Sequence, residues 1–164
     1  MGTAQVNNVV MAGGSDNAPN LIIPENALVL LGYKTLMASY PAPAANNVYE
    51  PFYDLSSGSA AVYQVPAGKT FHVVGIGAVS TVLPAEFTLV TATAAIAPGD
   101  TSLTGGVYMH GQAAGGGLVL TTSAVTQNWS LMFALQQNLF PGIHAIANGG
   151  TNHMTVWLIG KEIG

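Results

Sequence analysis

The sequence predicts an all-β protein built as an antiparallel β-sandwich, and two observations support this prediction. From Val48 onward, short β-rich runs recur at regular intervals and are separated by turn residues. Helical periodicity is nearly absent, and the one Ala-rich stretch, residues 91–97, is cut short by Pro98-Gly99. Hydrophobic residues make up 49% of the chain and charged residues only 6%, so charge covers little of the surface.

The first 47 residues contain no sustained strand pattern. Residues 1–26 are mainly small and polar and lack a period of 2 or 3.6, which predicts an extended N-terminal arm. Two short apolar runs, 27–33 and 35–40, begin the sandwich domain, which we place at residues 27–164. The prolines of 41–47 exclude a central strand because proline cannot donate to the ladder, so this segment is a linker or an edge crossing.

Eight further β-rich runs follow, most of them separated by segments that contain proline, glycine or asparagine. Their number and spacing favour a sandwich or a barrel over a helical or mixed fold. A chain of 164 residues suits one domain with a substantial core. The predicted strands are 60–65, 70–80, 86–93, 101–109, 118–122, 128–135, 143–147 and 154–163.

Two of these runs have almost no polar face. In the run 154–163, Trp157 and Ile159 alternate with Val156 and Leu158. In the run 70–80, strict alternation separates Phe71, Val73, Gly75 and Gly77 from His72, Val74, Ile76 and Ala78. A sheet with one wet face alternates apolar and polar residues, and large exposed apolar patches are rare on monomers. We therefore predict a homo-oligomer, specifically a homotrimer.

The composition excludes several classes of partner. The apolar runs are shorter than the roughly 20 residues of a membrane-spanning helix, so we expect no membrane partner. Three lysines, no arginine and a net charge of −4 argue against nucleic acid, because Lys and Arg neutralise phosphates in such complexes. Without cysteine, the chain has no disulfide framework and no thiolate metal site.

Gly68-Lys69-Thr70 resembles the end of a phosphate-binding P-loop. The full motif requires a glycine five residues before Gly68, where this chain has Tyr63. A P-loop also leads into a helix, whereas a strand is predicted from Thr70 onward. We interpret the segment as a tight turn that leads into a strand.

The histidines do not form a metal-binding pattern. His144 and His153 flank the turn at 148–150 and could approach each other across a hairpin, but no His-x-His or His-x-x-x-Glu spacing accompanies them. We expect no metal and no cofactor. Two alternatives remain: a ring of histidines around a symmetry axis, and a cupin-like metalloenzyme in which His72, His110 or His144 converge.

The acidic residues do not suggest an active site. Seven carboxylates are scattered along the chain, mostly at turns or segment ends, and Glu50 and Asp54 are expected on an exposed crossover. No Gly-x-Ser-x-Gly sequence is present. We therefore predict a non-enzymatic protein without catalytic residues.

Two stretches resemble β-sandwich virion proteins of tailed bacteriophages. Residues 63–71 contain Val65-Pro66-Ala67-Gly68-Lys69-Thr70, which is similar to the turn before a strand in those proteins. Residues 140–143 with 156–163 resemble their closing hairpin, in which a proline–glycine turn precedes a last strand with a late G-x-E. The resemblance covers about the last two-thirds of the chain, and the first 47 residues share none of it.

This resemblance implies a jelly-roll-like sandwich and a structural role in the virion. The expected function is that of a capsid decoration, or cement, protein that binds its own copies and the major capsid protein or other virion proteins. The predicted assembly contacts are Leu21, Ile22 and Ile23 of the arm and Trp157 and Ile159 of the last strand. The alternative is a glycan- or receptor-binding module of a phage fibre or tail, in which exposed aromatic rings would stack on sugars.

Overall fold

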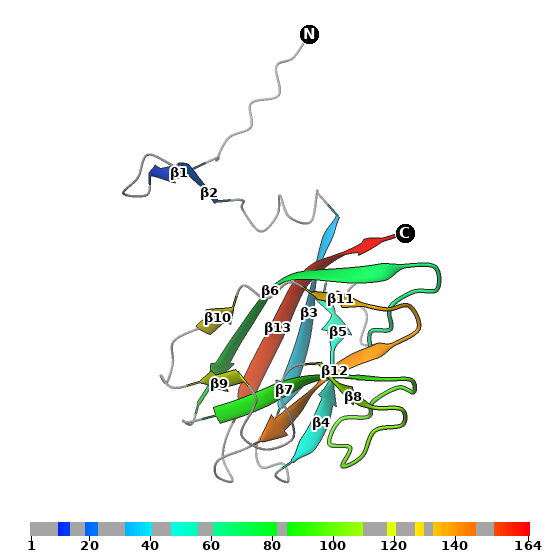
Figure 1. Cartoon of the computed structure of the whole chain (residues 1–164). Coiled ribbons are helices and arrows are strands. Elements are labelled where there is room, and N and C mark those ends of the chain that lie inside the picture. Colours follow the sequence, from blue (N-terminus) through cyan, green and yellow to red (C-terminus); the bar gives the residue numbers. More distant parts are fainter. Residues whose placement is uncertain are drawn as a thin grey trace. The chain divides into compact units, whose positions relative to one another are not determined.

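The computed structural model describes residues 10–13, 19–22, 32–40, 47–55, 61–81, 85–109, 118–120, 127–129, 133–146 and 153–164 (Figure 1). These ranges contain strands and no α-helix, and every pair of strands with a defined register is antiparallel. The predicted all-β, antiparallel fold is therefore confirmed. No helix in the described ranges is long and apolar enough to span a membrane.

The chain divides into two compact units, residues 1–33 and 34–164. In the first unit, β1 (Val10–Gly13) pairs with β2 (Pro19–Ile22) from Val10↔Ile22 to Gly13↔Pro19. Part of the segment predicted as an extended arm is thus a β-hairpin, in which the two strands satisfy each other's backbone groups. The boundary after residue 26 stays a prediction.

The second unit contains two sheets. In the first, named here the β6–β13 sheet, the order is β10-β6-β13-β3-β5, and β11 also pairs with β6. Its strands are β3 (Tyr33–Tyr40), β5 (Tyr53–Asp54), β6 (Thr70–Ser80), β10 (Gln127–Trp129), β11 (Phe133–Leu135) and β13 (Met154–Ile163).

The second sheet, named here the β7–β12 sheet, has the order β4-β12-β7-β8, and β9 also pairs with β7. Its strands are β4 (Val48–Pro51), β7 (Ala85–Ala92), β8 (Val107–Tyr108), β9 (Leu118–Leu120) and β12 (Phe140–Ile146). The last two long strands, β12 and β13, therefore belong to different sheets. The predicted closing hairpin between them is wrong.

The core lies between the two sheets, and each sheet contributes alternate residues to it. On β13, Val156 and Leu158 are buried while Trp157 and Ile159 lie half-buried on the opposite face, as alternation predicts. The largest fully buried side chains of this cluster are Tyr40, Phe52, Phe71, Phe87, Leu36, Leu135, Ile143, Met154, Leu158 and Val48. Burial of such side chains supplies most of the driving force for folding.

Strand β6 departs from strict alternation because it contains a β-bulge. Ile159 pairs with Gly75, but the next residue of β13, Gly160, pairs with Val73, so Val74 has no partner of its own. An extra residue in one strand reverses the inward and outward positions beyond it. The core residues of β6 are consequently Phe71, Val73, Ile76 and Ala78, and the face assignment predicted from the sequence is wrong for this strand.

The outer face of the β7–β12 sheet is covered by the chain itself. Val90, Ala92 and Ile96 form a second buried cluster, against which Tyr49, Leu103, Tyr108 and Phe140 pack. Backbone hydrogen bonds hold the covering segment, residues 93–106, in place: Tyr49 N donates to Asp100 O (2.7 Å), and Thr93 N donates to Thr104 O (3.0 Å). The sandwich thus has one outer face that is covered by its own loop.

Candidate functional site

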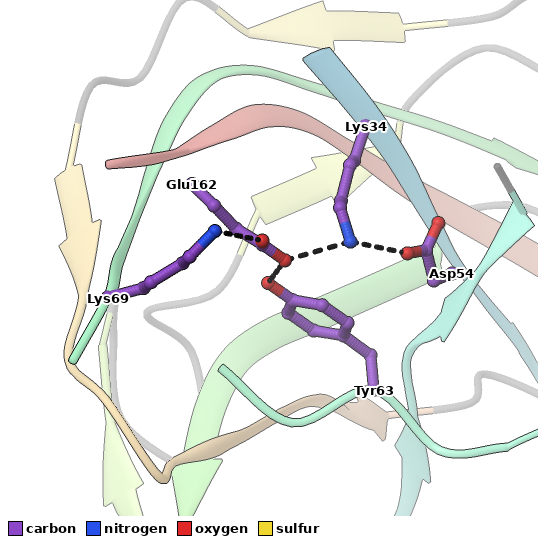
Figure 2. Close-up of polar contacts among 5 residues, drawn as sticks. All are labelled: Lys34, Asp54, Tyr63, Lys69 and Glu162. Carbon is purple, nitrogen blue, oxygen red and sulfur yellow. Dashed lines mark hydrogen bonds and ion pairs between the residues drawn. The ribbon is translucent and has the colours of Figure 1, made fainter. Parts of the chain in front are cut away.

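Charged side chains gather at one place in the sandwich (Figure 2). The chain has three lysines and seven acidic residues, and Lys34, Lys69, Asp54 and Glu162 converge there with Tyr63. These five residues are named here the Glu162 cluster. They come from β3, β5, the segment 61–69 and β13, so the cluster joins parts of the chain that are far apart in sequence.

Glu162 lies at the centre of these contacts. Its Oε1 is 2.8 Å from Lys34 Nζ and accepts a hydrogen bond of 3.0 Å from the Tyr63 hydroxyl, and its Oε2 is 3.6 Å from Lys69 Nζ. Lys34 Nζ also donates to Asp54 Oδ2 at 2.9 Å and lies 5.6 Å from the centre of the Tyr63 ring. The Lys34 amine is therefore held between two carboxylates and an aromatic ring.

The two carboxylates of the cluster are largely shielded from water, whereas the Lys69 side chain is 43% exposed. The side chains of Asp54 and Glu162 are 9% and 12% exposed, and that of Lys34 is 29% exposed. Burial disfavours the charged Lys34 amine, but hydrogen bonds to Glu162 and Asp54 outweigh this effect and raise its pKa. Burial likewise disfavours the Glu162 carboxylate, but hydrogen bonds from Lys34 and Tyr63 outweigh it and lower its pKa. The resting cluster is an ionic network.

The sequence did not identify this cluster. Glu50 and Asp54 were expected on an exposed crossover, and this prediction is wrong, because they are only 3% and 7% exposed. The sequence did offer one clue, because lysine is rare in it. With only three lysines and no arginine, each lysine was a candidate for an ion pair with one of the seven acidic residues. Which acid each lysine meets depends on sheet order, and sequence patterns do not give that order.

Glu50 is a second buried carboxyl group, located on edge strand β4. It lies opposite Ile143, which faces the core, and its Oε1 accepts a hydrogen bond of 3.1 Å from Gly99 N. Burial raises the pKa of Glu50 to about 7, and the nearby Asp100 adds to this while the Gly99 N–H opposes it. This group can therefore change its charge near neutral pH.

The histidines are not brought together. His72 is exposed on β6 and His144 is buried on β12, in the other sheet, and His110 lies outside the described residues. His144 stacks on Tyr49 with ring centres 4.7 Å apart, and burial lowers its pKa despite a hydrogen bond to the Asn47 backbone. Its Nδ1 and the opposite Thr88 Oγ1 are buried without a hydrogen-bond partner.

His144 and His153 do not face each other across a hairpin, because β12 and β13 belong to different sheets. Among the described residues, no group of three His, Asp or Glu side chains is arranged to hold a metal ion. The convergence that a cupin-like site requires is thus not formed by His72 and His144.

The Gly68-Lys69-Thr70 segment is a turn that leads into a strand, as predicted. Gly68 has a φ of +74°, and Lys69 N donates to Pro66 O at 3.1 Å before β6 begins at Thr70. Gln137 Oε1 accepts a hydrogen bond of 2.6 Å from Gly68 N. The amide of Gly68 is therefore used within the fold.

The predicted assembly residues lie in both units. Leu21 and Ile22 belong to β2, opposite Met11 and Val10, and Ile23 lies outside the described residues. Trp157 and Ile159 lie half-buried on β13, on the face turned away from the core. The role of these residues in assembly stays a prediction.

The outer face of the β6–β13 sheet is mainly apolar. Trp157 lies over Gly77, where any Cβ atom would collide with the indole ring. Ile159 and the exposed Val74 and Ile163 extend the same face, with exposed fractions of 41% for Val74 and 52% for Ile163. Lys161 is the one charged side chain among the outward residues of β6 and β13.

No protein-family model matches this chain, and no curated protein matches it.

Proposed function

We propose that this chain is a non-enzymatic structural protein of a phage virion, specifically a capsid decoration protein that binds neighbouring subunits. The resemblance of residues 63–71 to the turn before a strand in β-sandwich virion proteins supports the virion assignment. The low charge content supports a subunit that is fixed in an assembly, since obligate interfaces are depleted of charge.

One observation carries the proposal: the two outer faces of the sandwich differ. The β7–β12 sheet is covered by residues 93–106, whereas no described segment forms a comparable layer over Trp157 and Ile159. A sheet face that carries Trp157 and, on β6 and β13, a single charged side chain loses little polar hydration on association. We therefore assign assembly to the outer face of the β6–β13 sheet.

The oligomeric state tests this assignment. Light scattering of the purified protein is expected to give three times 16.7 kDa. Ile159→Lys places a charge on the proposed face and is expected to yield monomers, since burying an unpaired charge costs several kcal/mol. Val107→Lys is the matched control, because Val107 is 59% exposed on β8 of the other sheet. A wild-type monomer, or equal effects of both variants, would contradict the assignment.

The virion role is tested separately with particles. The wild-type protein is expected to bind undecorated phage heads with a fixed stoichiometry, and Ile159→Lys is expected to bind at least tenfold more weakly. Added sodium chloride is expected to have little effect, because few charges are available to screen. An oligomer that binds a glycan array and does not bind heads would favour the receptor-binding alternative.

A further inference from the structure

Within the Glu162 cluster, two carboxyl groups contact the same primary amine. Lys34 Nζ lies 2.9 Å from Asp54 Oδ2 and 2.8 Å from Glu162 Oε1 (Figure 2). The carbon that an amine would attack is Asp54 Cγ. This carbon is bonded to Oδ2, which Lys34 Nζ already contacts. These are the three groups that amide formation requires: a nucleophile, an acyl carbon and a proton acceptor.

We propose that Lys34 and Asp54 join in an intramolecular amide (isopeptide) bond, with Glu162 as the catalytic residue that transfers the protons. The inference is independent of the virion role. It identifies a site of self-modification in which both reactants belong to the chain and the product is a covalent link between β3 and β5.

The reaction balances without an added reactant. Lys34 Nζ first passes one proton to Asp54 Oδ2 along the existing hydrogen bond, which gives a neutral amine and a neutral carboxylic acid. Nζ then attacks Cγ, and Glu162 Oε1 accepts a proton from the nitrogen as the C–N bond forms. Glu162 returns this proton to the departing hydroxyl, the C–O bond breaks and one water leaves. Nothing is oxidised or reduced.

The fold holds the reactants in place. Asp54 pairs with Leu36, so Lys34, two residues before Leu36, lies diagonally across the β3–β5 pair from Asp54. Fixing two groups in this way gives effective concentrations of about 10⁵–10⁸ M in favourable cases, which favours condensation even in water. The Tyr63 ring, 5.6 Å from Nζ, further limits access of solvent to the amine.

The ionic resting state determines the rate of the reaction. Because the cluster favours the charged amine, the neutral pair that reacts is a minor species. The reaction therefore proceeds slowly, and each molecule needs to react only once. Cross-linking removes one positive and one negative charge, so it leaves Lys69 paired with Glu162 and the net charge of the cluster unchanged.

Mass spectrometry of the full-length protein tests the proposal directly. After prolonged incubation, the intact mass is expected to be lower than the sequence mass by about 18 Da, the mass of one water. Trypsin cleaves after lysine, and the chain has three lysines and no arginine. An acylated Lys34 resists cleavage, so residues 1–69 are expected to remain one species instead of separating into 1–34 and 35–69.

Three variants identify the reacting groups. Lys34→Arg keeps the charge and the tryptic site but has no nucleophilic amine, so full mass and cleavage after residue 34 are expected. Asp54→Asn would release ammonia in place of water, a loss of about 17 Da. Glu162→Gln retains a hydrogen-bond acceptor for Tyr63 but cannot take up the proton, so at least a tenfold slower loss of mass is expected.

The wild-type protein alone can overturn the proposal, even if a variant fails to fold. Retention of full mass, together with cleavage after Lys34, would overturn it. An equal loss of mass in Lys34→Arg would also overturn it, because the lost water would then come from another site. If Glu162→Gln reacts at the wild-type rate, the assignment of Glu162 as the catalytic residue is wrong.

Discussion

Glu50 places a buried carboxyl group on β4, the edge strand of the β7–β12 sheet. In the folded protein it keeps its proton up to a pH of about 7, whereas in the unfolded chain it loses the proton near the ordinary value of 4.5. The folded-state pKa is the higher one, so the contribution of Glu50 to stability is complete below pH 4.5. It is lost as the pH rises through about 7.

We therefore predict that Glu50→Gln abolishes the part of the stability decrease with rising pH that is due to Glu50. Glutamine cannot ionise and can still accept the hydrogen bond from Gly99 N. Urea denaturation at a series of pH values is expected to give similar free energies of unfolding for variant and wild type near pH 4.5. At pH 8 the variant should be more stable, on the order of 2 kcal/mol. A difference that does not change with pH would show that ionisation of Glu50 is not its cause.

Gly77 is required because the Trp157 indole occupies the space above it. We predict that Gly77→Val displaces the ring toward solvent and shifts its fluorescence emission to longer wavelength. The measurement uses a Trp129→Phe background, because the chain has two tryptophans. Gly75→Ala is the control, since a Cβ atom there has no neighbour within 4 Å and the emission should stay unchanged. An equal shift in both variants would contradict this role of Gly77.

At the scale of the element, the bulge in β6 predicts that substitutions of the adjacent residues Val73 and Val74 have different effects on stability. Val73 is 2% exposed and Val74 is 41% exposed, although strict alternation groups Val74 with the core residues Ile76 and Ala78. Val73→Ala is expected to lower the free energy of unfolding by about 2 kcal/mol, and Val74→Ala by less than about 0.5 kcal/mol. Chemical denaturation measures both. A larger loss for Val74→Ala would mean that the bulge is absent.

The strands show which features the sequence can predict. Alternation gave the correct faces for β13, where the period of 2 is uninterrupted from Met154 to Ile159. It failed on β6, because one extra residue reverses the pattern and no residue type marks its position. The predicted strand 101–109 forms a strand only at Val107–Tyr108. The residues before Val107 belong to the segment that covers the outer face of the β7–β12 sheet.

The Glu162 cluster could not be predicted for a related reason. Lys34, Asp54 and Glu162 have no characteristic spacing, and they meet only because β3 lies between β5 and β13. Sequence patterns give the period within a strand, but pairing between strands distant in sequence depends on packing of the whole core. The turn at Gly68 is local and was predicted correctly.

For the whole molecule, the division into two units predicts that the sandwich folds without the N-terminal segment. Deletion of residues 1–26 is expected to change the melting temperature of the remaining protein by less than about 2 °C, since the deleted residues belong to the other compact unit. Circular dichroism measures the melting. If the shortened protein does not fold, these residues are part of the sandwich core and the predicted boundary is wrong.

The same deletion distinguishes the two proposed assembly surfaces. If Leu21, Ile22 and Ile23 contact a neighbour, the shortened protein should bind phage heads at least tenfold more weakly while its sandwich remains folded. Unchanged binding would leave the outer face of the β6–β13 sheet as the assembly surface.

Within the described part of the chain, only the outer face of the β7–β12 sheet has a covering segment, and this difference has a consequence for symmetry. If two copies met through the outer face of the β6–β13 sheet of each, the contact would be isologous and would close at two subunits. A closed ring of three instead needs a heterologous contact, in which this face of one subunit meets a different surface of the next. The number of subunits therefore reports the geometry of the contact: a dimer would mean that Trp157 meets its own symmetry mate, and a trimer that each Trp157 meets a surface elsewhere on its neighbour.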